Sequence, residues 1–154
     1  DWVNISDLGP KWLERTEKQI TTEAVDKFKK KPAKKGSLLY SFKLTVGAVS
    51  LAAKDFYTNE AIAAFQPGRL LDIDFFYYLA PIAIIQNASE NIYGAKILNQ
   101  EAIGNAKLII PPLPEQKAIA DFPSAAAAME SEFRWLSTQR PAPFAWQAGW
   151  CSSR

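Results

Sequence analysis

An alternation of apolar and polar positions over residues 37–46, in the run SLLYSFKLTV, is the clearest pattern in the chain. A period of two predicts a half-buried β-strand with a polar outer face. The apolar face holds Leu38, Tyr40, Phe42, Leu44 and Val46, and the polar face holds Ser37, Ser41, Lys43 and Thr45. Leu39 is the apolar exception on the polar face. Gly47 predicts a bulge or bend before the alternation resumes at Val49 and Leu51.

Three further short strands are predicted, over residues 1–6, 61–65 and 107–110. The first alternates, the second follows a polar corner, and the third combines apolar and β-branched residues. Pro111 and Pro112 end the third strand, because proline cannot donate an N–H to a ladder.

Helices are predicted where apolar residues recur at helical spacing after a capping residue. One covers about residues 23–30, is capped by Thr21 or Thr22, and is stopped by Pro32. Asp72 or Asp74 caps a second helix that ends near Pro81. Asn99 caps a single turn over 100–103, and Pro114 opens a helix whose first turn contains Glu115.

These elements predict a mixed α/β (α+β) fold in which short helices flank a small, mostly antiparallel sheet. The 154 residues fit one domain plus a tail. We expect the domain at 1–113, the start of a helical connector at 114–122, and an atypical tail at 123–154. In the tail, a short helix over 125–136 is predicted, with little regular structure beyond Pro141.

Composition argues against an active site within the chain. There is no histidine, which is the usual general base and the commonest metal ligand. The nearest carboxylate pair, Asp72 and Asp74, is better explained by helix capping. No glycine-rich phosphate loop or metal-ligand spacing is present, so we expect no catalytic residue, metal or cofactor.

The chain also carries no pattern typical of a membrane span. Its longest apolar stretch, residues 75–85, is about half of the length that a span requires and contains Pro81. We expect it to be a buried helix. The single cysteine, Cys151, fits a reducing, cytoplasmic setting.

Lysine is concentrated in one segment, and no acidic residue lies between Lys27 and Lys43. The clustered residues are Lys27, Lys29, Lys30, Lys31, Lys34 and Lys35. Such a patch is typical of a protein that binds a polyanion. The alternative is a solvated helix end and loop with no partner.

The order of seven segments carries a family resemblance. The chain reads WVNISDL, ITTEAVDKF, KGSLLYSFKLTVGAVSLA, YTNEAIAAFQP, FFYYLA, ILNQEAIGN and PPLPEQKAIADF. Over residues 1–122, this succession resembles a target-recognition domain of the specificity subunits of type I restriction-modification enzymes.

The resemblance implies a non-catalytic subunit that binds double-stranded DNA sequence-specifically and directs methylation and cleavage by its partners. Those partners are methyltransferase subunits and an ATP-driven restriction subunit that translocates DNA. A second recognition domain or a dimer partner reads the other half of a split target.

Three departures from the family pattern shape our expectations. One recognition domain is present, and the family's usual segment before the first strand is missing. After Phe122 the family continues as a long heptad-bearing helix, whereas residues 123–154 do not. We expect a truncated or frame-shifted end, and an alternative function as a protein-interaction or remnant module that does not read DNA.

The candidate DNA-binding residues follow from charge and polarity. The six clustered lysines are the phosphate candidates. Base candidates should be polar residues beside that patch: Ser41, Lys43, Thr45, Lys54, Thr58 and Asn59. The alternatives are that Lys43 and Thr45 face water, and that Asn59 closes a turn through backbone bonds.

Overall fold

The computed structural model describes residues 1–87, 89–90 and 96–121. Its strands are β1 (Trp2–Val3), β2 (Trp12–Leu13), β3 (Leu38–Ser41), β4 (Val49–Ala52), β5 (Tyr57–Thr58), β6 (Ile62–Phe65), β7 (Ser89–Glu90) and β8 (Lys96–Ile97). Its helices are α1 (Thr22–Lys27), α2 (Ile73–Ala83), α3 (Gln100–Gly104) and α4 (Leu113–Ala120), with 3-10 turns η1 (Ile5–Asp7) and η2 (Ile85–Asn87).

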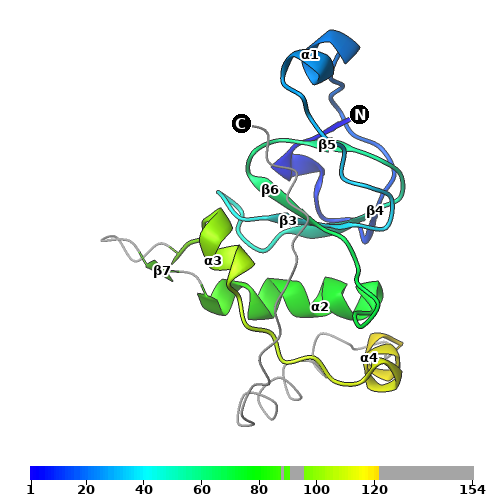
Figure 1. Cartoon of the computed structure of the whole chain (residues 1–154), viewed down its shortest axis with the longest axis vertical. Helices are drawn as coiled ribbons and strands as arrows, with labels where there is room; N and C mark the ends of the chain where they lie inside the picture. The colour runs from blue at the N-terminus through cyan, green and yellow to red at the C-terminus, as the bar shows by residue number, and fades with distance from the viewer. Residues whose placement is uncertain (88, 91–95, 122–154) are drawn as a thin grey trace.

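A four-stranded sheet in the order β2-β4-β3-β6 forms the centre of the molecule. β3 is antiparallel to both neighbours, and β2 is parallel to β4. A parallel β1–β5 pair lies on one side of this sheet and α2 on the other, with α1 and α4 towards opposite ends of the long axis (Figure 1). The predicted mixed α/β class with a mostly antiparallel sheet is confirmed.

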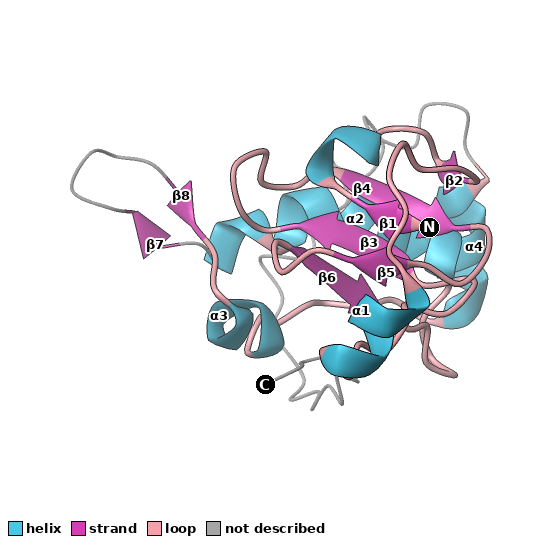
Figure 2. Cartoon of the chain, turned by 90° about the horizontal axis from the view of Figure 1, so that it is seen from above, coloured by secondary structure: helices cyan, strands magenta, loops and turns pink. Residues whose placement is uncertain are grey.

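Two apolar cores fill the two sides of the central sheet. Leu38, Tyr40 and Phe42 belong to the core that α2 covers, whereas Leu39 belongs to the core beneath β1 and β5. The view from above shows β1 and β5 lying over the central sheet (Figure 2). Leu39, the exception in the sequence pattern, is therefore the core residue of the second face.

The predicted polar outer face of this strand is wrong. All four residues of β3 are buried, and so is Ser37 just before them. A strand covered on both faces has no solvated side, so burying its polar groups is costly. The buried hydroxyls of Ser37 and Tyr40 have no hydrogen-bond partner among the described residues. Burial also raises the pKa of Tyr40 to about 12.

The strand also ends earlier than predicted, at Ser41. The N–H of Ser41 donates to the Ala48 carbonyl (2.8 Å), and the N–H of Gly47 donates to the Ser41 carbonyl (2.9 Å). These bonds close a β3–β4 hairpin, with Gly47 at φ 90° in the bend that the sequence predicts. Leu44, predicted to face the core, lies on the turn instead.

The observed N-caps are the predicted residues, whereas the C-terminal ends of the helices differ from the predicted ones. Thr21 and Asp72 accept from backbone N–H groups of α1 and α2, as expected. α1 ends at Lys27, because the positive φ of Lys29 (48°) leaves the helical region.

α2 continues through Pro81 and ends at Ala83, two residues beyond the proline that was predicted to stop it. The helix buries Phe75, Phe76 and Leu79, among others. Burial of three such side chains contributes about 1.5–3 kcal/mol each, which exceeds the roughly 3 kcal/mol cost of an interior proline.

The segment before α4 is not the predicted strand. Residues 107–110 form no ladder, and the edge strands of the central sheet are β2 and β6. Leu108 and Ile110 pack instead against the core that α2 covers. α4 then begins with proline in its first turn, as predicted.

Gln116 connects α4 to the domain. Its side chain is fully buried; its amide nitrogen donates to the carbonyls of Leu70 (2.9 Å) and Pro111 (2.8 Å), and its oxygen accepts from the N–H of Asp72 (2.7 Å). One side chain therefore joins α4, the segment before it and the N-terminus of α2.

Two further helices were predicted from the sequence, at 100–103 and at 125–136. The single turn capped by Asn99 is confirmed as α3, whose Ala102 N–H donates to the Asn99 side chain (2.7 Å). The tail helix predicted over 125–136 lies outside the described residues. Among the helices that the structure describes, none is long and apolar enough to cross a membrane.

Candidate nucleic-acid interface

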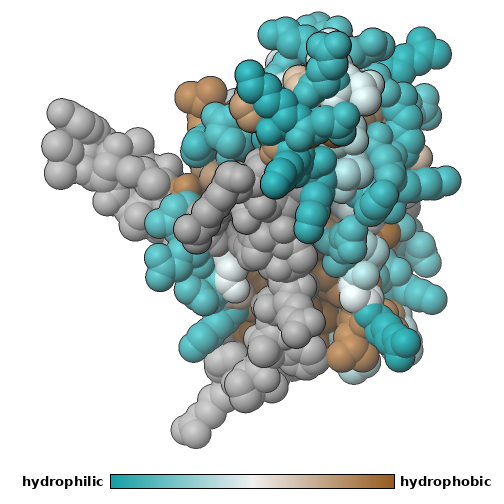
Figure 3. Space-filling view, turned by 45° about the horizontal axis from the view of Figure 1, so that its top comes forward, coloured by the Kyte–Doolittle hydropathy of each residue, from teal (hydrophilic) through white to brown (hydrophobic). Residues whose placement is uncertain are grey.

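The clustered lysines lie on α1 and on the loop that leads from it into β3. Five of them are exposed and Lys30 is half-buried. Hydrophilic residues gather over this end of the molecule (Figure 3). Ala33 anchors the loop, since its backbone exchanges two hydrogen bonds with Phe56 (2.7 and 2.9 Å). Ala33 and Phe56 both belong to the core beneath β1 and β5, so the loop that carries the lysines is fixed to that core.

Lys34 has an acidic partner that the sequence pattern does not reveal. Its ammonium group lies 2.7 Å from a carboxylate oxygen of Asp55, and the other oxygen accepts from the Lys35 N–H (2.9 Å). These bonds lower the pKa of Asp55 and, in return, Asp55 raises the pKa of Lys34, so both groups stay charged at neutral pH. Asp55 thereby offsets one of the six cluster charges.

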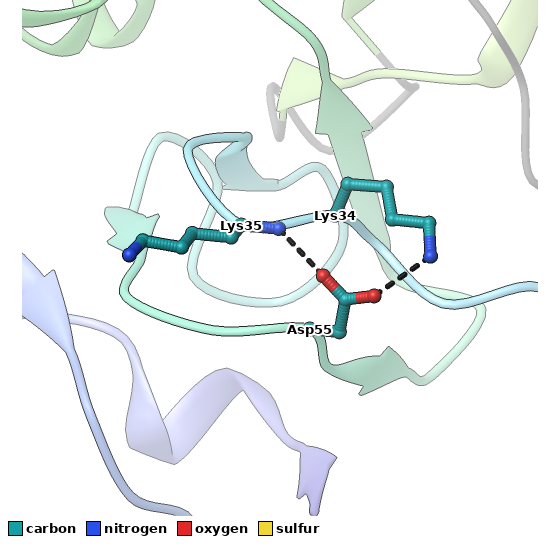
Figure 4. A network of polar contacts seen from close by, with 3 residues as sticks. All are labelled: Lys34, Lys35 and Asp55. Carbon is teal, nitrogen blue, oxygen red and sulfur yellow. Dashed lines mark hydrogen bonds and ion pairs between the residues drawn. The ribbon is translucent and has the colours of Figure 1, made fainter.

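The neighbouring lysine remains available. Figure 4 shows the side chain of Lys35 extending away from Asp55, to which it is joined only through its backbone. Neither Lys29 nor Lys35 forms a side-chain ion pair within the described residues. Both present a full positive charge to solvent.

Two other lysines lie against aromatic rings. The ammonium of Lys30 is 5.3 Å from the ring centroid of Trp2, and that of Lys27 is 5.8 Å from that of Phe28. A cation–π contact orients a lysine without neutralising it. The backbone of Lys18 lies beside Trp2, because its carbonyl accepts from the Trp2 N–H (2.9 Å). Sequence reasoning missed Lys18, since nothing in the pattern predicts that residues 2 and 18 pair.

The base candidates do not gather beside the lysine loop as expected. Leu38 pairs with Leu51 and Tyr40 with Val49, so the lysine loop and Lys54 lie at one end of β3. The turn with Lys43 and Thr45 lies at the other end. Four strand residues span roughly 13 Å. The structure therefore separates the candidates into two groups.

Lys54 is the base candidate nearest the lysine loop, and it is engaged. Its ammonium lies 2.5 Å from a carboxylate oxygen of Asp1 and 5.4 Å from the Phe56 ring centroid. To contact a base, Lys54 would have to break its ion pair with Asp1.

Ser41 is positioned as a structural residue. It is fully buried, and its hydroxyl donates to the Lys43 carbonyl (2.9 Å). This bond supports the turn from beneath, so the side chain faces the protein interior and not a ligand.

Thr58 and Asn59 are half-buried near the edge of the β1–β5 pair. The side-chain oxygen of Asn59 accepts from the Ala61 N–H (2.9 Å), which is the turn-closing role given as the alternative. Its amide nitrogen makes no hydrogen bond within the described residues and remains a donor.

The structure gives no sign of a metal centre in the part that it describes. No three His, Cys, Asp or Glu side chains gather there in a way that could hold a metal ion. The chemistry available at this surface is charge, hydrogen bonding and apolar contact.

The chain is similar to proteins of one family. The family described as "Type I restriction modification DNA specificity domain" matches residues 1–130. The crystal structure of the HsdS subunit from Thermoanaerobacter tengcongensis shares the fold, with a TM-score of 0.51 and 17% identity over 88% of this chain and 30% of that one. A chain titled for complex assembly and conformational transition of the type I R-M system is 21% identical, over 70% of this chain and 25% of that one, at a TM-score of 0.45. The chain therefore spans under a third of the length of these solved relatives.

Proposed function

Because the chain belongs to the family of type I restriction-modification DNA specificity domains, we propose that it binds double-stranded DNA in a sequence-specific manner. The observation that carries the proposal is the family match over residues 1–130. The exposed lysines around the α1 end give the proposal a physical basis, since they offer phosphate contacts.

The proposal divides the surface into two roles. Lysines of the cluster neutralise phosphates, and Lys43, Thr45, Lys54, Thr58 and Asn59 supply candidate base contacts. The two groups lie at opposite ends of β3, about 13 Å apart along the strand. We propose that one duplex contacts both groups.

The specificity domain is the non-catalytic part of its system, so chemistry falls to partners. We propose methyltransferase subunits and an ATP-driven restriction subunit as these partners, and a second recognition domain or dimer partner for the other half of the target. Residues 1–113 form the recognition domain in this scheme, and 114–122 begin the connector. The complex would act in the cytoplasm, where the DNA is.

A salt titration of the full chain tests DNA binding. If about four lysines engage phosphates, the log–log salt slope is roughly −3.6, so the Kd weakens roughly 150-fold between 50 and 200 mM salt. Fluorescence anisotropy with a labelled random duplex measures this slope, and selection from a duplex library then measures preference. Absent or salt-insensitive binding would overturn the proposal and favour a protein-interaction module.

Asp55→Asn should strengthen DNA binding. The substitution removes a negative charge and releases Lys34, whose ammonium then becomes a further phosphate ligand. We expect the salt slope to become steeper by roughly 0.9 and the Kd at 50 mM salt to tighten severalfold. The matched control is Asp121→Asn, an equal change of charge at the end of α4. Equal tightening by both variants would show that only net charge matters.

A further inference from the structure

Leu44 combines two unusual properties at the tip of the β3–β4 hairpin. Its side chain is 92% exposed, compared with 44–58% for the other exposed large apolar residues of the described chain. Its backbone is also left-handed, with φ 59°. Leucine seldom adopts this conformation, which glycine or asparagine occupies more readily. Neither burial nor backbone geometry accounts for a leucine at this position.

The turn that carries Leu44 is held at its base. Ser41 bonds both across the hairpin to Ala48 and up to the Lys43 carbonyl. A Cβ added to Gly47 would lie 3.8 Å from the Pro81 carbonyl oxygen, so the turn sits against α2. Leu44 therefore projects from a fixed support, with exposed Lys43 and Thr45 on either side.

We propose that Leu44 is a specificity-determining residue that enters the major groove and packs against the C5-methyl group of a thymine. This inference rests on the proposed DNA-binding function. The major groove admits a two-stranded β-ribbon, whereas the minor groove, ~6 Å wide, does not favour a hairpin turn. In the major groove, the apolar group on the base edges is the C5-methyl of thymine. Lys43 and Thr45, the base candidates on either side of Leu44, can hydrogen-bond to neighbouring base edges.

The test removes the methyl group and the leucine separately. The duplex that the full chain prefers is first selected from a library, and each thymine is then replaced singly by deoxyuridine. At one thymine we expect deoxyuridine to weaken binding by the unaltered chain about fivefold, and Leu44→Ala to weaken it by a similar factor. With Leu44→Ala, the same deoxyuridine should have no further effect.

Leu70→Ala is the matched control, because Leu70 is an exposed leucine (58%) near α4. It should retain the full response to deoxyuridine. Thermal unfolding by circular dichroism verifies that Leu44→Ala folds.

The outcomes separate this inference from the function on which it rests. If the unaltered chain binds no duplex, both fail. If it binds selectively but no thymine couples to Leu44, or the selected site contains no thymine, only the role of Leu44 is overturned. Unchanged DNA binding by Leu44→Ala, with loss of partner-subunit assembly, would also overturn it and assign the tip to a protein contact.

Discussion

Gln116→Met should lower the free energy of unfolding by about 3 kcal/mol. The substitution keeps most of the side-chain volume but removes three hydrogen bonds, to Leu70, Pro111 and Asp72. Each loss leaves a backbone group without its partner, which costs about 1 kcal/mol or more where water cannot replace it. For a chain of this length, the melting temperature should fall by roughly 10 °C.

The position of Gln116 explains why so much depends on it. Ile119 and Ala120 of α4 pack against the core and are only partly buried, and Gln116 is the only fully buried residue described in this helix. The amide satisfies the chain just before α4 and the N-terminus of α2 together. No other natural side chain of this size offers two donors and an acceptor in one plane.

Urea denaturation followed by circular dichroism measures the effect, with Lys117→Met as the control at an exposed neighbouring position. Amide hydrogen exchange adds a local readout, because α4 can detach before the domain unfolds. Faster exchange confined to α4 would locate the loss there. If the free energy of unfolding of Gln116→Met lies within about 0.5 kcal/mol of that of the unaltered chain, the role given to Gln116 is contradicted.

Local signals in the sequence predicted the helix starts well. Thr21, Asp72 and Asn99 cap helices because their side chains accept bonds from nearby backbone, within three residues. Such interactions need no knowledge of the rest of the fold. The bend at Gly47 is predictable for the same reason.

Features that depend on distant partners were not predictable. The polar residues of β3 resembled a solvated face, but the β1–β5 layer buries them. Residues 107–110 had strand composition, but Leu108 and Ile110 pack against the core that α2 covers and pair with no strand. Pro81 indicated a helix end, and burial of the α2 face overrode it. Each outcome was decided by packing that a local pattern does not contain.

The candidate site shows the same division. Lysine clustering identified an exposed charged segment directly. The ion pairs of Lys34 with Asp55 and of Lys54 with Asp1 join residues about twenty or more positions apart and were not visible. Leu44 was assigned to the core because it continued the alternation, and the hairpin closure at Ser41 and Gly47 placed it in solvent instead.

Neutralising the lysine cluster should have the largest effect on DNA binding. With all six cluster lysines changed to glutamine, we expect the salt slope to approach zero and affinity at 50 mM salt to fall at least roughly a hundredfold. The reason is that counterion release supplies most of the non-specific binding energy, and each engaged lysine releases about one ion.

Two double variants distinguish a local interface from net charge. Lys27→Gln with Lys29→Gln removes two charges at the α1 end, and should make the slope shallower by roughly 1.8 if both lysines contact phosphates. Lys107→Gln with Lys117→Gln removes two exposed charges from α4 and the segment before it. That pair should leave the slope nearly unchanged. Equal effects of the two pairs would mean that DNA is attracted by net charge and not by this surface, and an unaltered affinity in the sixfold variant would exclude the lysine cluster as the phosphate-binding site.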